Sequence, residues 1–379
     1  MEFTRFVAIP VVDGHIHFPH PDLADDLIDV MDRIGLVRAN LVGVPDLEMV
    51  NQNPALIHFK ARYPRRATIC GALDYTHAWA DPVRASQALA DQIATLKAIG
   101  FDGLKLIEGK PMVRKLLGLP LDGPVYAGMW AALEEQGLPV VFHVADPEEF
   151  WDDEGCPDWA RAQGWFYGDG TYPLKEDLYA EVDRVLERHP SLQIIFAHFY
   201  FLSADLERAG AFLDAHPAVC FDLTPGVEMY LNFARDLDAA RDFFIRYADR
   251  LVYGTDIGAS AIDHDPAQGL DRAESLGRAW VVRQFLETDG SFGAPEGVGH
   301  WLGMDAEGFH GIVLPTNVLE QIYRANFERM FGAAPAVLDR GAALAELERM
   351  ASVIDARAGE SVDSPARQVA QELAGENCS

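Results

Sequence analysis

Short apolar runs alternate along the chain with longer stretches in which apolar residues recur at helical spacing. The runs cover residues 6–17, 39–45, 67–73, 103–107, 140–144, 193–198, 219–223 and 251–255. Between them, residues such as Leu89, Ile93 and Leu96 fall on one face of a helix with a period of 3.6. Helical segments are expected at 22–35, 82–100, 126–137, 175–189, 204–216 and 236–249, with Gly35, Gly100 and Gly137 as left-handed caps.

The runs are apolar on both faces, which is typical of a parallel sheet covered by helices. Eight such units predict an α/β fold of the (β/α)₈ TIM-barrel type. An open doubly wound sheet is the alternative, but no glycine-rich phosphate loop follows the first run. We therefore expect one barrel over residues 1–332.

The 379 residues exceed the roughly 250 of a simple barrel. Two long connections, 146–172 after the fifth run and 258–315 after the eighth, open from carboxyl ends of strands, where barrel active sites lie. The first is rich in aromatic residues, which indicates a satellite core, a lid over an apolar or aromatic substrate, or both. Residues 333–379 form a C-terminal extension, with a helix near 342–356 and a polar tail, that docks on the barrel or on a second subunit of a homo-oligomer.

Residues that can bind a metal ion, four histidines and one aspartate, stand at the ends of four apolar runs. His15 and His17 end the first run, and their spacing turns both rings to the same side of a strand. His143, His198 and Asp256 end three later runs. Imidazole nitrogens and carboxylate oxygens bind divalent cations, so the pattern predicts a dispersed metal site at one rim of the barrel. A buried structural histidine is the alternative for any single member.

Two further histidines serve as an internal comparison. His189 and His216 precede strands, which would place them at the opposite, stabilising face of the barrel. We interpret both as structural.

The ordered set resembles the amidohydrolase superfamily over residues 6–332. The resemblance rests on Asp13-Gly14-His15-Ile16-His17, His143, His198 and Asp256. Residues 314–332 also resemble the closing helix of the amidohydrolase-related branch, which includes aminocarboxymuconate semialdehyde decarboxylase.

The resemblance implies one divalent ion, zinc as the expected metal and manganese or iron as alternatives. It assigns the ion to His15, His17, His143 and Asp256, and it turns His198 toward the substrate. Other branches hold two metals bridged by a carbamylated lysine. Lys105 on the fourth strand leaves that arrangement open.

A metal with these ligands lowers the pKa of bound water from 15.7 toward about 7. We expect a hydrolase that attacks an amide, ester or lactone of a small, carboxylate-bearing substrate, with Asp256 moving the proton and His198 polarising the carbonyl or acting as an acid or base. Decarboxylation of an aromatic or dienoic acid is the alternative, and a catalytically silent metal-binding barrel is the second. The first strand carries H-x-H rather than the E-x-H of some decarboxylases in the branch, which favours hydrolysis.

Three other residues at strand ends are candidates for contact with the substrate. Lys105 would give the barrel mouth a positive spot for a carboxylate, or else pair with Glu108. Glu108 and Glu228 could bind a ligand, although Glu228 could instead cap the next helix.

The net charge and the cysteine content limit the classes of binding partner and the compartment that we expect for this protein. A formal net charge of −28 disfavours nucleic acid and anionic membranes as partners. The four cysteines lack C-x-x-C spacing, no run is long enough to span a bilayer, and the first residues do not resemble a signal peptide. These features predict a soluble cytoplasmic protein with reduced thiols that acts on a small molecule.

Overall fold

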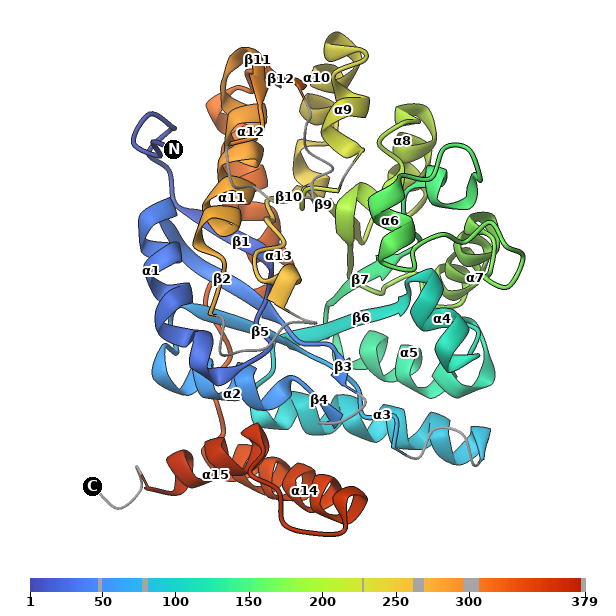
Figure 1. Ribbon diagram of the computed structural model, residues 1–379, viewed down its shortest axis with the longest axis vertical. Helices are drawn as coiled ribbons and strands as arrows, with labels where there is room; N and C mark the ends of the chain where they lie inside the picture. Colours follow the sequence, from blue (N-terminus) through green and yellow to red (C-terminus); the bar gives the residue numbers. More distant parts are fainter. Residues whose placement is uncertain (47–49, 77–80, 227, 262–268, 296–306, 376–379) are drawn as a thin grey trace.

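Eight parallel strands form one sheet whose spatial order follows the sequence, so the barrel prediction is confirmed (Figure 1). The computed structural model describes residues 1–46, 50–76, 81–226, 228–261, 269–295 and 307–375. The barrel strands are β1 (Val11–His17), β2 (Leu36–Val42), β5 (Ala67–Gly71), β6 (Gly103–Gly109), β7 (Val140–Val144), β8 (Ile194–Phe196), β9 (Val219–Asp222) and β10 (Leu251–Val252).

Helices surround the strands and cover the outer face of the sheet (Figure 1). The described α-helices, including those that lie outside this layer, are α1 (Ala24–Ile34), α2 (Asn53–Arg62), α3 (Pro82–Ile99), α4 (Pro111–Leu117), α5 (Pro124–Gln136), α6 (Asp158–Ala162), α7 (Lys175–Arg188), α8 (Leu206–Ala215), α9 (Met229–Phe233), α10 (Leu237–Arg246), α11 (Arg272–Glu287), α12 (Thr316–Glu320), α13 (Asn326–Phe331), α14 (Arg340–Ala358) and α15 (Pro365–Gly375). Gly35, Gly100 and Gly137 end their helices in the left-handed conformation, as predicted, with φ of 76°, 102° and 60°.

Helix α13 closes the end of the barrel at which the strands begin. Its Phe327, Met330 and Phe331 pack on a buried apolar layer contributed by seven barrel strands. The Asn326 amide donates to the carbonyls of Ala248 and Leu251, which ties the helix to the start of β10. The expected closing helix is therefore present, and the opposite rim is left open for chemistry.

The aromatic connection 146–172 has a small core of its own. Phe150, Cys156, Ala160 and Tyr167 are buried together, and partly buried aromatic rings surround them. This confirms the satellite-core interpretation. The second connection supplies α11 and an antiparallel hairpin of β11 (Asp289–Gly293) and β12 (Glu307–Ile312). Residues 262–268 and 296–306 of that connection lie outside the described part of the chain.

The C-terminal extension docks on the barrel, although its tail is not the polar segment expected. Helices α14 and α15, red in Figure 1, lie along the outside of the barrel next to α3 and α2. The tail forms α15 because Ala366, Val369 and Leu373 recur at helical spacing and bury one face. The same face brings Glu372 within 2.7 Å of His58 Nδ1 on α2.

Cys70, Cys156 and Cys220 are buried and free, in agreement with the expectation of reduced thiols; Cys378 lies outside the described residues. None of the described helices combines the length and apolarity needed to cross a bilayer.

The floor of the barrel yields a stability prediction. Phe327 is fully buried and stacks on Phe331 with ring centroids 4.5 Å apart. We expect Phe327→Ala to lower the free energy of unfolding by about 3–5 kcal/mol, because the ring leaves a cavity that α13 cannot fill. Denaturant unfolding measures this. Val337→Ala, at an 89% exposed position, is the control and should stay within about 0.5 kcal/mol. Equal effects of the two substitutions would contradict the role of α13.

Candidate metal centre and active site

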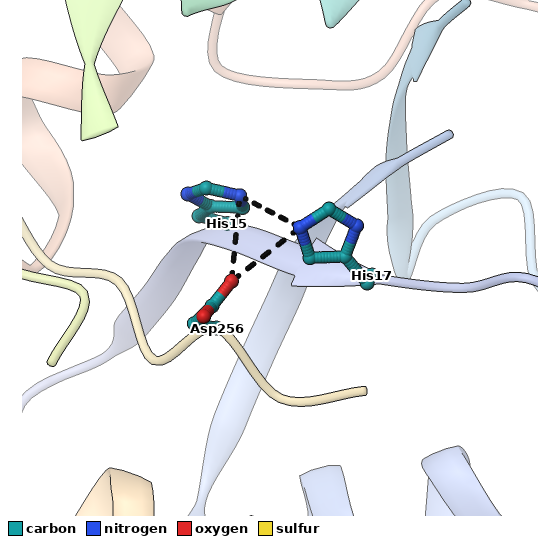
Figure 2. A group of neighbouring side chains, drawn as sticks. All are labelled: His15, His17 and Asp256. Carbon is teal, nitrogen blue, oxygen red and sulfur yellow. Dashed lines mark hydrogen bonds and ion pairs between the residues drawn. The ribbon is translucent and has the colours of Figure 1, made fainter. Parts of the chain in front are cut away.

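Three side chains from the first strand of the barrel and from the segment after the last strand meet at the open rim (Figure 2). His15 and His17 project from the same side of β1, and Asp256 reaches them from the segment after β10. One donor atom from each lies within 4.8 Å of the others. His15 Nε2 is 3.3 Å from His17 Nε2, and Asp256 Oδ1 is 3.7 Å and 3.4 Å from these two nitrogens.

Closure of the barrel itself creates this meeting point. The Gly14 amide donates to the Tyr253 carbonyl at 2.8 Å, and the Asp256 amide donates to the His15 carbonyl at 2.9 Å. A Cβ at Gly14 would lie 2.7 Å from Val252 Cγ1, so only glycine lets β1 approach β10 this closely. Asp256 itself has a φ of 60°, a conformation that aspartate tolerates better than most residues.

A buried carboxylate that the sequence analysis did not single out orients His15. Asp222, the last residue of β9, has its Oδ2 2.9 Å from His15 Nδ1. Its Oδ1 accepts hydrogen bonds from the amides of His198 and Thr224 and from the Thr224 hydroxyl. His15 therefore donates from Nδ1, which leaves Nε2 as an acceptor on the side of His17, Asp256 and Lys105, whose Nζ lies 2.9 Å away. A carboxylate that holds a histidine in this way is common behind metal ligands.

The same carboxylate fixes the loop that carries His198. The His198 backbone is left-handed, with φ 54° and ψ 42°. His198 Nδ1 lies 3.3 Å from the Thr224 carbonyl and 3.2 Å from Thr224 Oγ1. Both oxygens accept, because the hydroxyl proton goes to Asp222. The proton of neutral His198 therefore sits on Nδ1, and Nε2 is a hydrogen-bond acceptor.

His143 lies near this group but is turned away from it. Its ring centroid is 5.0 Å from that of His198, yet its Nε2 is 3.2 Å from Asp146 Oδ1 and 3.0 Å from the Ala145 carbonyl. Among the described residues, the compact group of donors thus holds His15, His17 and Asp256, and the structure does not bring His143 into it. Asp146 also accepts from Lys110 at 2.9 Å and from Tyr167 at 2.6 Å.

Burial keeps the histidines neutral. It lowers the pKa of His15 well below the ordinary value, lowers those of His17 and His143, and lowers the pKa of His198 to about 3. Burial alone would raise the pKa of Asp256, but the hydrogen bond with His17 and the nearby Arg278 guanidinium lower it, and the pKa lies well below its usual range. Neutral imidazoles beside an ionised carboxylate are the protonation states that a divalent cation requires. The donor set therefore fits such an ion.

A cavity of about 360 Å³ opens directly onto this group. His17, His143, His198 and Asp256 line one part of it. The remaining wall is largely apolar, and two of its charged members are Lys110 and Arg278. Phe150 and Trp165 of the aromatic connection line the cavity, so that segment forms a pocket wall as well as a satellite core.

Comparison with known proteins identifies the family. A sequence model described as Amidohydrolase matches residues 12–333. The chain belongs to the amidohydrolase family. The resemblance inferred from the dispersed histidines and aspartate is thereby confirmed. A comparison with curated proteins gives no match.

Solved structures share the fold at low identity. The apo form of IDCase from Metarhizium anisopliae is 16% identical, with a TM-score of 0.51 over 87% of this chain and 98% of that one. An amidohydrolase from Burkholderia multivorans with bound zinc is 15% identical, with a TM-score of 0.47 over 86% of this chain and all of that one. The likeness to the first of these structures supports the shared fold alone.

The predicted substrate contacts occupy three different environments. Lys105 Nζ lies 2.9 Å from His15 Nε2, where burial lowers its pKa to about 8. Glu108 accepts a 2.6 Å hydrogen bond from Tyr75 in a buried cluster. Neither is among the described residues that line the cavity. Lys105 therefore faces the candidate metal ligands, and Glu108 lies behind the wall.

Glu228 is the third predicted contact. Its side chain makes no capping bond to α9, so the capping interpretation is not supported. Its Oε2 is buried without a hydrogen-bond partner among the described residues, and burial raises its pKa to about 7. Gly226 of the same loop lines the cavity, which keeps Glu228 a candidate for contact with a ligand.

Asp222→Asn should weaken zinc binding about 10- to 100-fold, the range for loss of a partner behind a metal ligand. The amide cannot serve both as acceptor for His15 Nδ1 and as acceptor for the His198 loop. Competition with a chromophoric chelator measures the affinity.

Asp102→Asn is the matched control for this experiment. Asp102 is also a buried carboxylate, bonded to Lys60 at 2.6 Å, but it precedes β6 at the other end of the barrel. Its substitution should leave zinc affinity unchanged. A folded Asp222→Asn variant with wild-type zinc affinity would refute the role of Asp222 in orienting His15 as a metal ligand.

Proposed function

We propose that this amidohydrolase is a metal-dependent hydrolase that uses an activated water on an amide, ester or lactone carbonyl. The observation that carries the proposal is the compact group of His15, His17 and Asp256, which lies beside His198 next to the cavity. Membership of the amidohydrolase family supports an enzymatic role.

His15, His17 and Asp256 would hold the cation, and His143 would complete the set after exchanging its contact with Asp146. Zinc is the expected ion, with manganese or iron as alternatives, because imidazole and carboxylate accept all three. Such an ion, when bound, lowers the pKa of a coordinated water toward about 7 and polarises a carbonyl oxygen.

The chain's own residues would move the protons. Asp256 is ionised at neutral pH and is one of the three members of the donor group, so it can accept the proton of the attacking water and pass it to the leaving group. His198 is neutral with its proton on Nδ1, so its Nε2 can accept a hydrogen bond from that water and orient it. This arrangement favours the acceptor role of His198 over polarisation of the carbonyl.

Decarboxylation of an aromatic or dienoic acid is the second candidate. The aromatic wall favours it, because Phe150, Trp165 and Phe201 would surround a flat substrate and exclude water from its carboxylate. Both reactions would use the same metal donors and the same histidine.

A panel of amides, esters, lactones and aromatic or dienoic acids separates the two reactions. The zinc-loaded protein is incubated in ¹⁸O-labelled water, and each product is scored for ¹⁸O and for CO₂. Hydrolysis predicts ¹⁸O in the product. Release of CO₂ together with an organic product that contains no ¹⁸O would overturn the hydrolase in favour of the decarboxylase. The CO₂ is scored only for its amount, because it exchanges oxygen with water.

Asp256→Ala and His189→Ala make the controls of this panel. Asp256→Ala should lose both metal and turnover. His189 lies away from the candidate donors, and its Nδ1 is 2.9 Å from Glu134 Oε2. His189→Ala should therefore keep full activity.

His198→Asn should retain metal but lower turnover by about 10²-fold or more, the contribution of a positioned acid or base. Asparagine tolerates the left-handed backbone at this position, so the loop should keep its shape. Metal content and kcat are measured on the same preparation. A near wild-type kcat would remove His198 from the mechanism.

A further inference from the structure

A buried arginine from the second long connection lines the cavity. Arg278 lies on α11 and is only 2% exposed. Its Nε and Nη2 each lie 2.8 Å from Glu274 Oε1, one turn earlier on the helix. Its Nη1 lies 3.4 Å from Asp256 Oδ2. Arg278 is not among the site residues predicted from the sequence, because nothing in the pattern of α11 marks it as part of a site.

Arg278 and the histidines approach opposite oxygens of one carboxylate. Asp256 Oδ1 faces His15 and His17, whereas Oδ2 faces Arg278. The guanidinium is therefore a fixed positive charge next to the candidate metal donors. Its contact with Asp256 is long for a charged hydrogen bond, which usually measures 2.7–2.9 Å.

The other cation of the wall, Lys110, already has a short ion pair and an aromatic contact. The Lys110 ammonium lies 2.9 Å from Asp146 Oδ1 and 4.6 Å from the centre of the Trp165 ring. The buried Asp146 carboxylate needs such a partner, because an unpaired buried charge costs free energy. Lys105 is withdrawn toward His15 and does not line the cavity. Of the cationic side chains described around the site, Arg278 is the one that combines burial, a cavity position and a long contact to its second carboxylate.

We propose that Arg278 binds a carboxylate of the substrate and that the rest of that substrate is an apolar, flat body. A guanidinium presents a planar fork that matches a carboxylate, and its attraction is strong where water is excluded. Phe150, Trp165 and Leu116 supply the apolar wall for the body of the ligand. The inference deepens the proposed function, since it takes the cavity to be the substrate site and moves the carboxylate contact from Lys105 to Arg278.

The same helix offers a matched control. Arg283 is also buried, at 5% exposure, and also pairs with a glutamate one turn away, Glu287. It contacts the Val7 carbonyl and the Tyr323 ring and is not among the described cavity residues. Replacing it removes a comparable buried ion pair without touching the cavity.

The test compares a charged probe with a neutral one of the same shape. Calorimetric titration of the zinc-loaded protein with benzoate and with benzamide should show tighter binding of benzoate. In Arg278→Met the affinity for benzoate should fall about 10- to 100-fold, as for loss of a charged hydrogen bond, while that for benzamide stays unchanged. Arg283→Met should bind both probes as the wild type does. Inorganic phosphate, titrated in parallel, should bind more weakly than benzoate, because it cannot use the apolar wall.

Three results would overturn the proposal. The first is equal wild-type affinity for benzoate and benzamide, the second is an equal loss for both probes in Arg278→Met, and the third is phosphate binding at least as tight as benzoate binding. If Arg278→Met lost affinity for both probes equally and also lost zinc, Arg278 would be a residue that only positions Asp256. Zinc content of every sample is measured for this reason.

A conservative variant covers a failure to fold. If thermal unfolding shows that Arg278→Met is not folded, Arg278→Lys keeps the charge opposite Glu274 but loses the planar fork, and it should still lose benzoate affinity selectively. Unchanged benzoate affinity in Arg278→Lys would then refute the proposal. Because binding is measured without turnover, selective benzoate binding in a protein that hydrolyses nothing would refute the proposed function alone.

Discussion

The arrangement of the site depends on the buried carboxylate of Asp222. Four donors converge on it: the ring of His15, the amides of His198 and Thr224, and the Thr224 hydroxyl. Burial alone raises the pKa of Asp222, and an isolated carboxylate there would be costly. With these partners, the Asp222 carboxylate fixes the tautomer of His15 through Nδ1 and stabilises the left-handed backbone of His198 through its amide.

A second buried carboxylate braces the junction at which the barrel closes. Asp13 accepts from the His15 amide at 3.0 Å and from the Thr255 hydroxyl at 2.7 Å, and so joins β1 to the segment after β10. Burial, opposed by these hydrogen bonds, raises its pKa to about 7. The rigidity that a metal site needs is therefore built from polar contacts on both sides of β1, with the apolar floor beneath them.

The barrel provides the donors, and the two long connections provide the surroundings. The first connection supplies the aromatic wall and Tyr167, which bonds to the Asp146 carboxylate that holds His143. The second supplies Arg278, which bonds to Asp256. Loops at the carboxyl ends of barrel strands are where one fold acquires different specificities, and both connections follow that rule.

The sequence by itself determined the architecture and the chemical type of the site. Hydrophobic runs separated by helical segments specify the order of strands and helices, because burial on both faces and the 3.6 period are local properties. The H-x-H spacing and the polar ends of later runs brought His15, His17 and Asp256 to one rim, since parallel strands end together. Asp222 is the last residue of β9 and the one charged residue of the run 219–223, so a search for polar residues near strand ends could have found it.

Only the tertiary structure decided which donors meet and what surrounds them. The turn of His143 toward Asp146, the withdrawal of Lys105 toward His15 and the approach of Arg278 to Asp256 depend on contacts between residues far apart in the chain or on the local loop geometry. No periodicity encodes such contacts. For α15 the information was present in the sequence, because its apolar residues recur at helical spacing. The polar composition of the tail masked this pattern, and the helix was not predicted.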